Sequence, residues 1–144
     1  MLVSEWMSHP VQTVKAQDTA SHARELLEKH RINQLPVVAG AKLMGIVTDR
    51  DLRDAFPSVF ESAAGGTSHG EGYVEPDKVL IESVMTHNLV SVASSTALSE
   101  AAQTMSTERV GALPVIDDGK LVGLLCRADI LKAFVVLAEQ KSGD

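Results

Sequence analysis

The chain has 144 residues, of which 44% are hydrophobic, and this is enough for one compact domain or for two small halves that share a core. Its 19 acidic residues outnumber its 13 basic ones, and the net charge of −6 argues against nucleic acid or an anionic membrane as a partner. The single cysteine, Cys126, excludes an intrachain disulfide and a metal site with several thiolates. Because the sequence shows no membrane-spanning apolar run and no signal-peptide pattern, we expect a cytoplasmic protein.

Apolar spacing in the first 56 residues predicts short strands that alternate with helices. Ala20, Ala23 and Leu27 follow a helical period. The runs over 35–38 and 43–47 are continuously apolar, which is typical of strands that are covered on both faces. The expected elements are a helical turn over 3–7 capped by Ser4, a strand over 11–14, a helix from Asp18 or Thr19 to about His30, strands over 35–38 and 43–47, and a helix over 49–56.

Residues 57–80 form a predicted linker. Within it, residues 63–72 are rich in glycine and small polar residues, a composition typical of flexible segments. The linker is either a plain tether or a contact for a partner.

The second half of the chain repeats the same order of elements. Its final helix, over 127–140, is apolar on almost every side, so we expect it to be buried, in part against another copy of the chain. The other expected elements are a helical turn near 81–85, a strand near 90–92, a helix over 99–108, and strands over 112–116 and 121–125.

An internal repeat with an offset of 78 residues aligns the two halves without a gap. Gly45 falls on Gly123 and Asp51 on Asp129, while the sequence Leu-Pro-Val at 35–37 recurs at 113–115. Two copies are too few for a solenoid, which needs about three repeats to build a continuous core. The repeat therefore predicts a closed pair in which each half covers the other.

A strand that runs directly into a helix recurs in both repeats, at 45–51 and at 123–129. Thr48 is placed to cap the first of these helices, and such a corner offers free N–H groups to an anion. A carboxylate at Asp51 would repel phosphate, so it is better suited to accept from ligand hydroxyls. Together they indicate a site for a ribose that carries phosphate, whereas the alternative interpretation is an ordinary capped helix.

The chain resembles a pair of CBS domains, together called a Bateman module, and is similar to the CBS portion of acetoin-utilisation regulators. The resemblance implies an α+β, sandwich-like fold in which two tandem motifs pack with pseudo-two-fold symmetry. It assigns residues 1–56 to the first CBS motif, 57–80 to the linker and 81–144 to the second motif. The motifs that carry it are WMSHPV at 6–11, RINQLPVV at 31–38 and GIVTDRD at 45–51, with VMT at 84–86, RVGALPVI at 109–116 and GLLCRAD at 123–129.

The resemblance further implies that an adenosine nucleotide binds in the cleft between the two motifs. AMP, ADP, ATP or S-adenosylmethionine would be the ligand rather than a resident cofactor. Asp51 would bind the ribose hydroxyls, and Thr48 the ribose or a phosphate. The slot for adenine would be formed around Val11, Thr13, Leu35, Pro36 and Val37.

The second repeat departs from the family pattern at Cys126, which replaces the expected hydroxyl, although Asp129 remains. Because a thiol is a weak donor and acceptor, this corner is the poorer candidate. Arg127 would face the phosphate of a nucleotide bound by the first repeat, and Arg50 would play the reverse role. The alternative for both arginines is a solvated residue at a helix start.

These features favour a regulatory, energy-sensing module that forms a homodimer and acts on an unknown effector protein. The alternative is a ligand-free dimerisation scaffold, in which the two Asp residues only start helices. An enzyme is disfavoured because no nucleophile elbow, phosphate-binding loop or metal-ligand spacing is present in the sequence.

Overall fold

The computed structural model describes residues 1–56, 75–87 and 90–142, and it confirms the mixed helix and strand architecture. Two compact units divide the chain, and neither coincides with one sequence repeat. The central unit is Gln12–Leu89, and the terminal unit combines Met1–Val11 with Val90–Asp144. Each unit therefore contains a segment from the other repeat. Most of the predicted linker, residues 57–74, lies outside the described residues.

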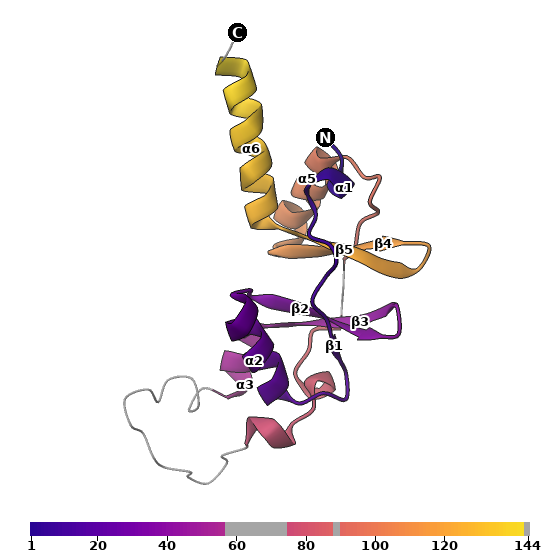
Figure 1. The fold of residues 1–144 in the computed structure, drawn as a ribbon, viewed down its shortest axis with the longest axis vertical. Helices are drawn as coiled ribbons and strands as arrows, with labels where there is room; N and C mark the ends of the chain where they lie inside the picture. The colour runs from indigo at the N-terminus through magenta and orange to yellow at the C-terminus, as the bar shows by residue number, and fades with distance from the viewer. Residues whose placement is uncertain (57–74, 88–89, 143–144) are drawn as a thin grey trace, which may run out of the picture. The chain divides into compact units, whose positions relative to one another are not determined.

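The central unit is a three-stranded sheet covered on one face by two helices (Figure 1). The strand order is β1-β2-β3, with β1 parallel and β3 antiparallel to β2. Its elements are β1 (Val14–Lys15), α2 (Ala20–His30), β2 (Gln34–Ala39), β3 (Lys42–Thr48), α3 (Asp49–Ala55), and the 3-10 turns η2 (Pro76–Lys78) and η3 (Ile81–Ser83).

Local sequence signals account for the boundaries of α2. The hydroxyl of Thr19 accepts from the His22 N–H at 3.1 Å, so Thr19 rather than Asp18 is the cap. At the other end, Arg31 adopts a left-handed conformation with φ 53° and stops the helix. Residues 75–80 of the predicted linker also pack here, since the Ala20 N–H donates to the Val79 carbonyl at 2.8 Å.

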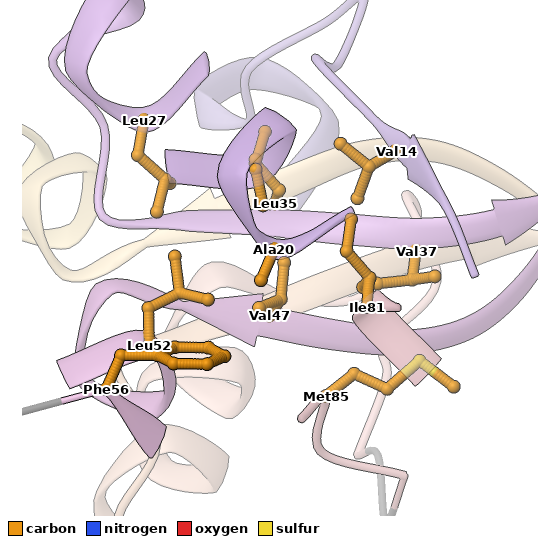
Figure 2. Packing of buried hydrophobic residues seen from close by; sticks show 11 residues of the cluster. Val14, Ala20, Leu27, Leu35, Val37, Val47, Leu52, Phe56, Ile81 and Met85 are labelled. Carbon is orange, nitrogen blue, oxygen red and sulfur yellow. The ribbon is translucent and has the colours of Figure 1, made fainter. Parts of the chain in front are cut away.

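The core of the central unit lies between the sheet and its helices. Figure 2 shows Leu35 and Val47 from the sheet on one side of Leu52 of α3, with Ile81 and Met85 closing the other end of the cluster. Ile81 and Met85 come from the second repeat, so the core is incomplete without that segment.

The terminal unit has the corresponding arrangement, with α5 and α6 on one face of a two-stranded sheet (Figure 1). Val92 adds a single parallel bridge to Val115 where a strand near 90–92 was expected. Its core gathers Val3, Leu98, Leu113 and Leu125. Its elements are α1 (Val3–Trp6), α5 (Leu98–Glu108), β4 (Ala112–Asp117), β5 (Lys120–Cys126) and α6 (Arg127–Ser142).

Two expectations need correction. The first turn starts after Leu2, whose N–H donates to the Glu5 carboxylate at 2.6 Å, and Ser4 is not its cap. The strand expected over 11–14 is only Val14–Lys15, because pairing with β2 begins at Val14. Within one chain the final helix buries Asp129 and Ala133 but leaves Leu131 and Phe134 64% and 65% exposed, so its expected contact with another copy stays a prediction. Among the described residues, no helix is long and apolar enough to span a membrane.

One hydrogen-bonded pair belongs to the second repeat alone. Ser94 donates to Asp117 from its hydroxyl at 2.5 Å and from its backbone N–H at 3.0 Å. These two bonds hold the pKa of Asp117 below its ordinary value. The corresponding residues of the first repeat are Ala16 and Ala39, which have neither the hydroxyl nor the carboxylate. The pair ties the turn before α5 to the end of β4.

Each unit receives a short segment from the other repeat, and backbone pairing next to a glycine holds that segment in place. Thr86 forms an antiparallel bridge with Ile46, with N···O distances of 2.8 and 3.0 Å. A Cβ on the neighbouring Gly45 would lie 2.8 Å from the Thr86 carbonyl and from Met85 Sδ. In the terminal unit, Ser8 bridges Leu124 in the same way, and a Cβ on Gly123 would contact Met7. Glycine is therefore required for the close approach of the incoming chain.

We predict that Gly45→Ala lowers the free energy of unfolding by about 1–3 kcal/mol, because the new methyl meets backbone that has no room to move. Urea denaturation followed by circular dichroism measures the change. Gly111→Ala is the matched control, since its Cβ would lie 3.7 Å from the nearest atom, an ordinary contact. Equal effects of the two substitutions would contradict this account of Gly45.

Candidate functional site

The strand-to-helix corner of the central unit is a reciprocal capping arrangement. β3 ends at Thr48 and α3 begins at Asp49. The Thr48 hydroxyl accepts from the Asp51 N–H at 3.0 Å, and the Thr48 N–H donates to Asp51 Oδ2 at 2.9 Å. Thr48 is therefore the cap that the sequence predicts, and Asp51 is its partner three residues later.

This geometry gives Asp51 a structural task that does not use up its carboxylate. A carboxylate offers about four acceptor positions, and the bond to the Thr48 N–H occupies one of them at Oδ2. The bond also fixes the orientation of the group. Asp51 is partly exposed, so its remaining positions are suited to a pair of ligand hydroxyls.

The structure brings seven of the predicted site residues into the central unit. The Thr48 corner pairs with Gln34 at the start of β2, and Val37 of β2 pairs with Val14 of β1. β1, β2 and β3 are neighbours in the sheet. The corner lies at the end of β3, the Leu-Pro-Val sequence on β2, and Thr13 directly before β1. The seven residues are Thr13, Leu35, Pro36, Val37, Thr48, Arg50 and Asp51.

The Leu-Pro-Val sequence contributes less side-chain surface than expected. Leu35 and Val37 are fully buried, and their side chains belong to the hydrophobic core (Figure 2). Any contact that these two residues make with an adenine would therefore come from the backbone. Partly exposed Thr13 is the more accessible predicted neighbour.

Arg50 has the geometry of a solvated helix-start residue. Its side chain is 91% exposed and lies 3.9 Å from Asp54, four residues later on α3. Such an exposed pair contributes little to stability and leaves the guanidinium mobile.

The terminal unit holds the other three predicted residues, Val11, Arg127 and Asp129, so the structure does not unite them with Thr48 and Asp51 within one unit. Asp129 is 9% exposed, and its Oδ2 accepts from the Cys126 N–H at 2.8 Å. The second corner therefore keeps the bond from carboxylate to backbone, with a thiol where the first corner has a hydroxyl.

One pair of hydrogen bonds, found at both corners, was not predicted from the sequence. The Asp49 N–H donates to the Asn33 carbonyl at 2.9 Å, and the Arg127 N–H donates to the Gly111 carbonyl at 3.1 Å. These bonds tie the start of each second helix to the turn that follows the first helix. The 78-residue offset was a signal for them, because it maps Asn33 and Asp49 onto Gly111 and Arg127. Among the described residues, no group of three His, Cys, Asp or Glu side chains could hold a metal ion.

The family model for the CBS domain matches residues 3–58 and 81–136, one match for each repeat. A CBS domain-containing protein of Dictyostelium discoideum is 34% identical over 142 residues, covering 96% of this chain and 94% of the relative. Inosine-5'-monophosphate dehydrogenase of Korarchaeum cryptofilum is 31% identical over 83% of this chain, but the match spans 21% of that enzyme.

Solved structures give the same result for the fold. A Vibrio cholerae protein assigned to acetoin utilization (AcuB) matches with a TM-score of 0.78 and 27% identity, covering 100% of this chain and 97% of that one. CBSX2 in complex with AMP matches with a TM-score of 0.76 and 27% identity, covering 95% and 98%. The CBS domain pair of protein MJ0100, in complex with 5'-methylthioadenosine and S-adenosylmethionine, matches with a TM-score of 0.75 and 28% identity, covering 93% and 95%.

We predict that Thr48→Ala lowers the free energy of unfolding by about 1 kcal/mol, because the Asp51 N–H loses its capping acceptor. Chemical denaturation measures this loss. Thr48→Ser keeps the hydroxyl and should retain most of the stability. If Thr48→Ser is as unstable as Thr48→Ala, the methyl group rather than the cap is responsible.

Proposed function

The chain belongs to the CBS domain family, and we propose that it is a regulatory module that binds an adenosine ligand in the cleft between its two motifs. AMP, ADP, ATP and S-adenosylmethionine are the candidate ligands. Binding would change the packing of the motifs or of two protomers, and through it the activity of a separate effector protein in the cytoplasm. A ligand has this effect only if it binds the two arrangements with different affinities.

The observation that carries the proposal is the orientation of Asp51. Its Oδ2 is held by the Thr48 N–H at 2.9 Å, so the carboxylate is ordered before any ligand arrives. A preordered acceptor loses little entropy on binding, which favours recognition of two adjacent hydroxyls. The ribose of an adenosine ligand carries such a pair.

The similar structures support the adenosine part of the ligand more than its 5' group. CBSX2 binds AMP, and MJ0100 binds 5'-methylthioadenosine and S-adenosylmethionine. These ligands share adenosine but carry anionic, neutral and cationic 5' groups. In this chain Arg50 is accompanied by Asp49 and Asp54 on α3, so the local charge does not select one 5' group.

We assign the stronger site to the first repeat. Its corner has both the Thr48 hydroxyl and the Asp51 carboxylate, whereas the second has the thiol of Cys126 beside Asp129. A thiol is the weaker hydrogen-bonding group. This difference predicts unequal affinities for the two halves of the cleft.

The extent of the matches supports a non-catalytic role. The chain spans almost the whole Dictyostelium relative and only about a fifth of the dehydrogenase. The matched part is thus a module that also occurs beside catalytic domains, and we propose that its role in this chain is regulatory.

The rival function is a ligand-free scaffold. Its support is that Asp51 and Asp129 each accept a backbone N–H at the start of their own helix. That structural task accounts for the acidic residue in both motifs without any ligand.

We predict that one class of adenosine ligand raises the unfolding temperature and that Asp51→Asn abolishes the shift. The asparagine keeps an oxygen for the Thr48 N–H but loses the charge, whereas Asp51→Ala would also remove part of the cap. A ligand at 100 times its dissociation constant stabilises the fold by about 2.7 kcal/mol. Differential scanning fluorimetry with AMP, ADP, ATP, S-adenosylmethionine and 5'-methylthioadenosine measures the shift.

Asp129→Asn is the matched control, because it makes the same change in the second corner and should reduce the shift less. If none of the five compounds shifts the unfolding temperature of the unmodified protein, the scaffold becomes the better hypothesis. If Asp51→Asn keeps the full shift, Asp51 is not the ribose ligand.

We also propose that α6 joins two copies of the chain. Phe134, Val135, Val136 and Leu137 are all exposed, and α6 continues beyond α5 and α1 (Figure 1). Residues 133–138 carry no charge in a chain with a net charge of −6. A two-fold helix pair would bury the same patch on both copies.

We predict that Phe134→Glu converts a dimer into a monomer, because the new carboxylate would be buried at the helix pair. Sedimentation velocity measures the oligomeric state. Gln140→Glu is the control, since it adds the same charge at an exposed position on the same helix. A monomeric unmodified protein, or an unchanged dimer in Phe134→Glu, would contradict an interface on α6.

A further inference from the structure

A groove lies between α5 and α6 in the terminal unit. Its volume is about 450 Å³, within the usual range for small-molecule sites. The floor is apolar, and it is formed by Ala102, Met105, Val110, Ile130 and Leu131. Ser106 and two arginines, Arg109 and Arg127, complete its lining. None of the lining residues is acidic.

The central unit has a groove at the same positions of the repeat, between α2 and α3, and its chemistry is different. There Arg24 pairs with Glu28 at 3.1 Å and Arg53 pairs with Asp49 at 3.0 Å. These four positions correspond to Ala102, Ser106, Leu131 and Arg127 of the terminal unit. The second repeat has thus replaced two ion pairs with apolar or small residues and one arginine.

The two arginines of the terminal groove lie outside the ion pairs formed in the described part of the chain. Within residues 1–56, 75–87 and 90–142, neither Arg109 nor Arg127 forms an ion pair. The backbone of Arg127 is fixed to the Gly111 carbonyl at 3.1 Å, and a Cβ on Gly111 would lie 3.7 Å from its guanidinium carbon. Arg109 ends α5 in a left-handed conformation with φ 56°. Positive charge and apolar surface therefore lie side by side in one groove of an otherwise acidic protein.

We propose that this groove binds an amphipathic anion, namely an aliphatic carboxylate. The carboxylate pairs with Arg109 and Arg127, since a guanidinium matches its planar geometry. The alkyl chain lies on Met105, Ile130 and Leu131. All of its lining belongs to the terminal unit, whereas Thr48 and Asp51 lie in the central unit. Arg127, which the family resemblance assigns to a nucleotide phosphate, is assigned here to the carboxylate instead. The central groove, with its internal ion pairs, does not bind the same ligand.

The experiment is calorimetric titration of the full chain with hexanoate, octanoate and decanoate, each below its micelle concentration. We expect one bound decanoate per chain, with affinity rising by about fourfold for each added methylene group that is buried. Decylamine, which carries the opposite charge, should not bind. Equal binding of decylamine and decanoate would overturn the proposal, and so would the absence of binding by decanoate.

Two variants test the location of the site. Arg109→Asn, which suits a left-handed position, should weaken decanoate binding by at least about tenfold. Arg31→Asn makes the same change at the left-handed position of the central unit and should leave binding unchanged. A larger loss of decanoate affinity in Arg31→Asn than in Arg109→Asn would overturn the assignment to this groove. So would an unchanged affinity in both variants.

A third variant introduces into the terminal groove an ion pair like the one in the central groove. Ala102→Arg with Ser106→Glu copies the Arg24–Glu28 pair onto α5, where both side chains would occupy the groove. Decanoate binding should be lost while the unfolding temperature stays close to that of the unmodified protein. Retained binding would overturn the proposal. Asp51→Asn should bind decanoate normally, so this test and that of the adenosine site fail or succeed independently.

Discussion

The fold depends on a short backbone pairing that joins each sheet to a segment from the other repeat. Thr86 bridges Ile46 in the central unit, and Ser8 bridges Leu124 in the terminal unit. Each bridge runs beside a glycine, because any side chain at Gly45 would meet the incoming backbone. The exchanged segment also carries core residues into the recipient unit. Neither repeat can therefore complete a core by itself, and the pair is the smallest folded unit.

The same corner that starts the second helix is the candidate ligand site. Thr48 and Asp51 satisfy each other's backbone N–H groups, and this holds the carboxylate in one orientation. An alanine substitution at Asp51 is hard to interpret, because it removes the capping contact and the proposed ligand contact together. Replacement by asparagine separates the tasks because it keeps the acceptor and removes the charge. In the second repeat, Cys126 leaves the carboxylate bond in place and changes the hydroxyl.

The sequence predicted those parts of the structure whose causes are local. The helical period and the cap at Thr19 predicted α2, and the spacing from Thr48 to Asp51 predicted the corner. It did not predict which unit receives the 81–87 segment, because an apolar turn fits either core and only the bridge to Ile46 decides. The difference between the two grooves was also missed, although it follows from comparing the repeats position by position. Ion pairs and apolar residues occupy equivalent places there, and helical periodicity alone does not distinguish their roles.

Regulation by an adenosine ligand requires that the ligand contact the Thr48 corner. The most direct measurement is a ¹H–¹⁵N correlation spectrum of the labelled chain, recorded during titration with AMP and with S-adenosylmethionine. We expect the largest shift changes on the amides of Thr13, Thr48 and Asp51, with smaller ones at Cys126 and Asp129. Saturable changes confined to other residues, or no changes with either compound, would contradict this expectation.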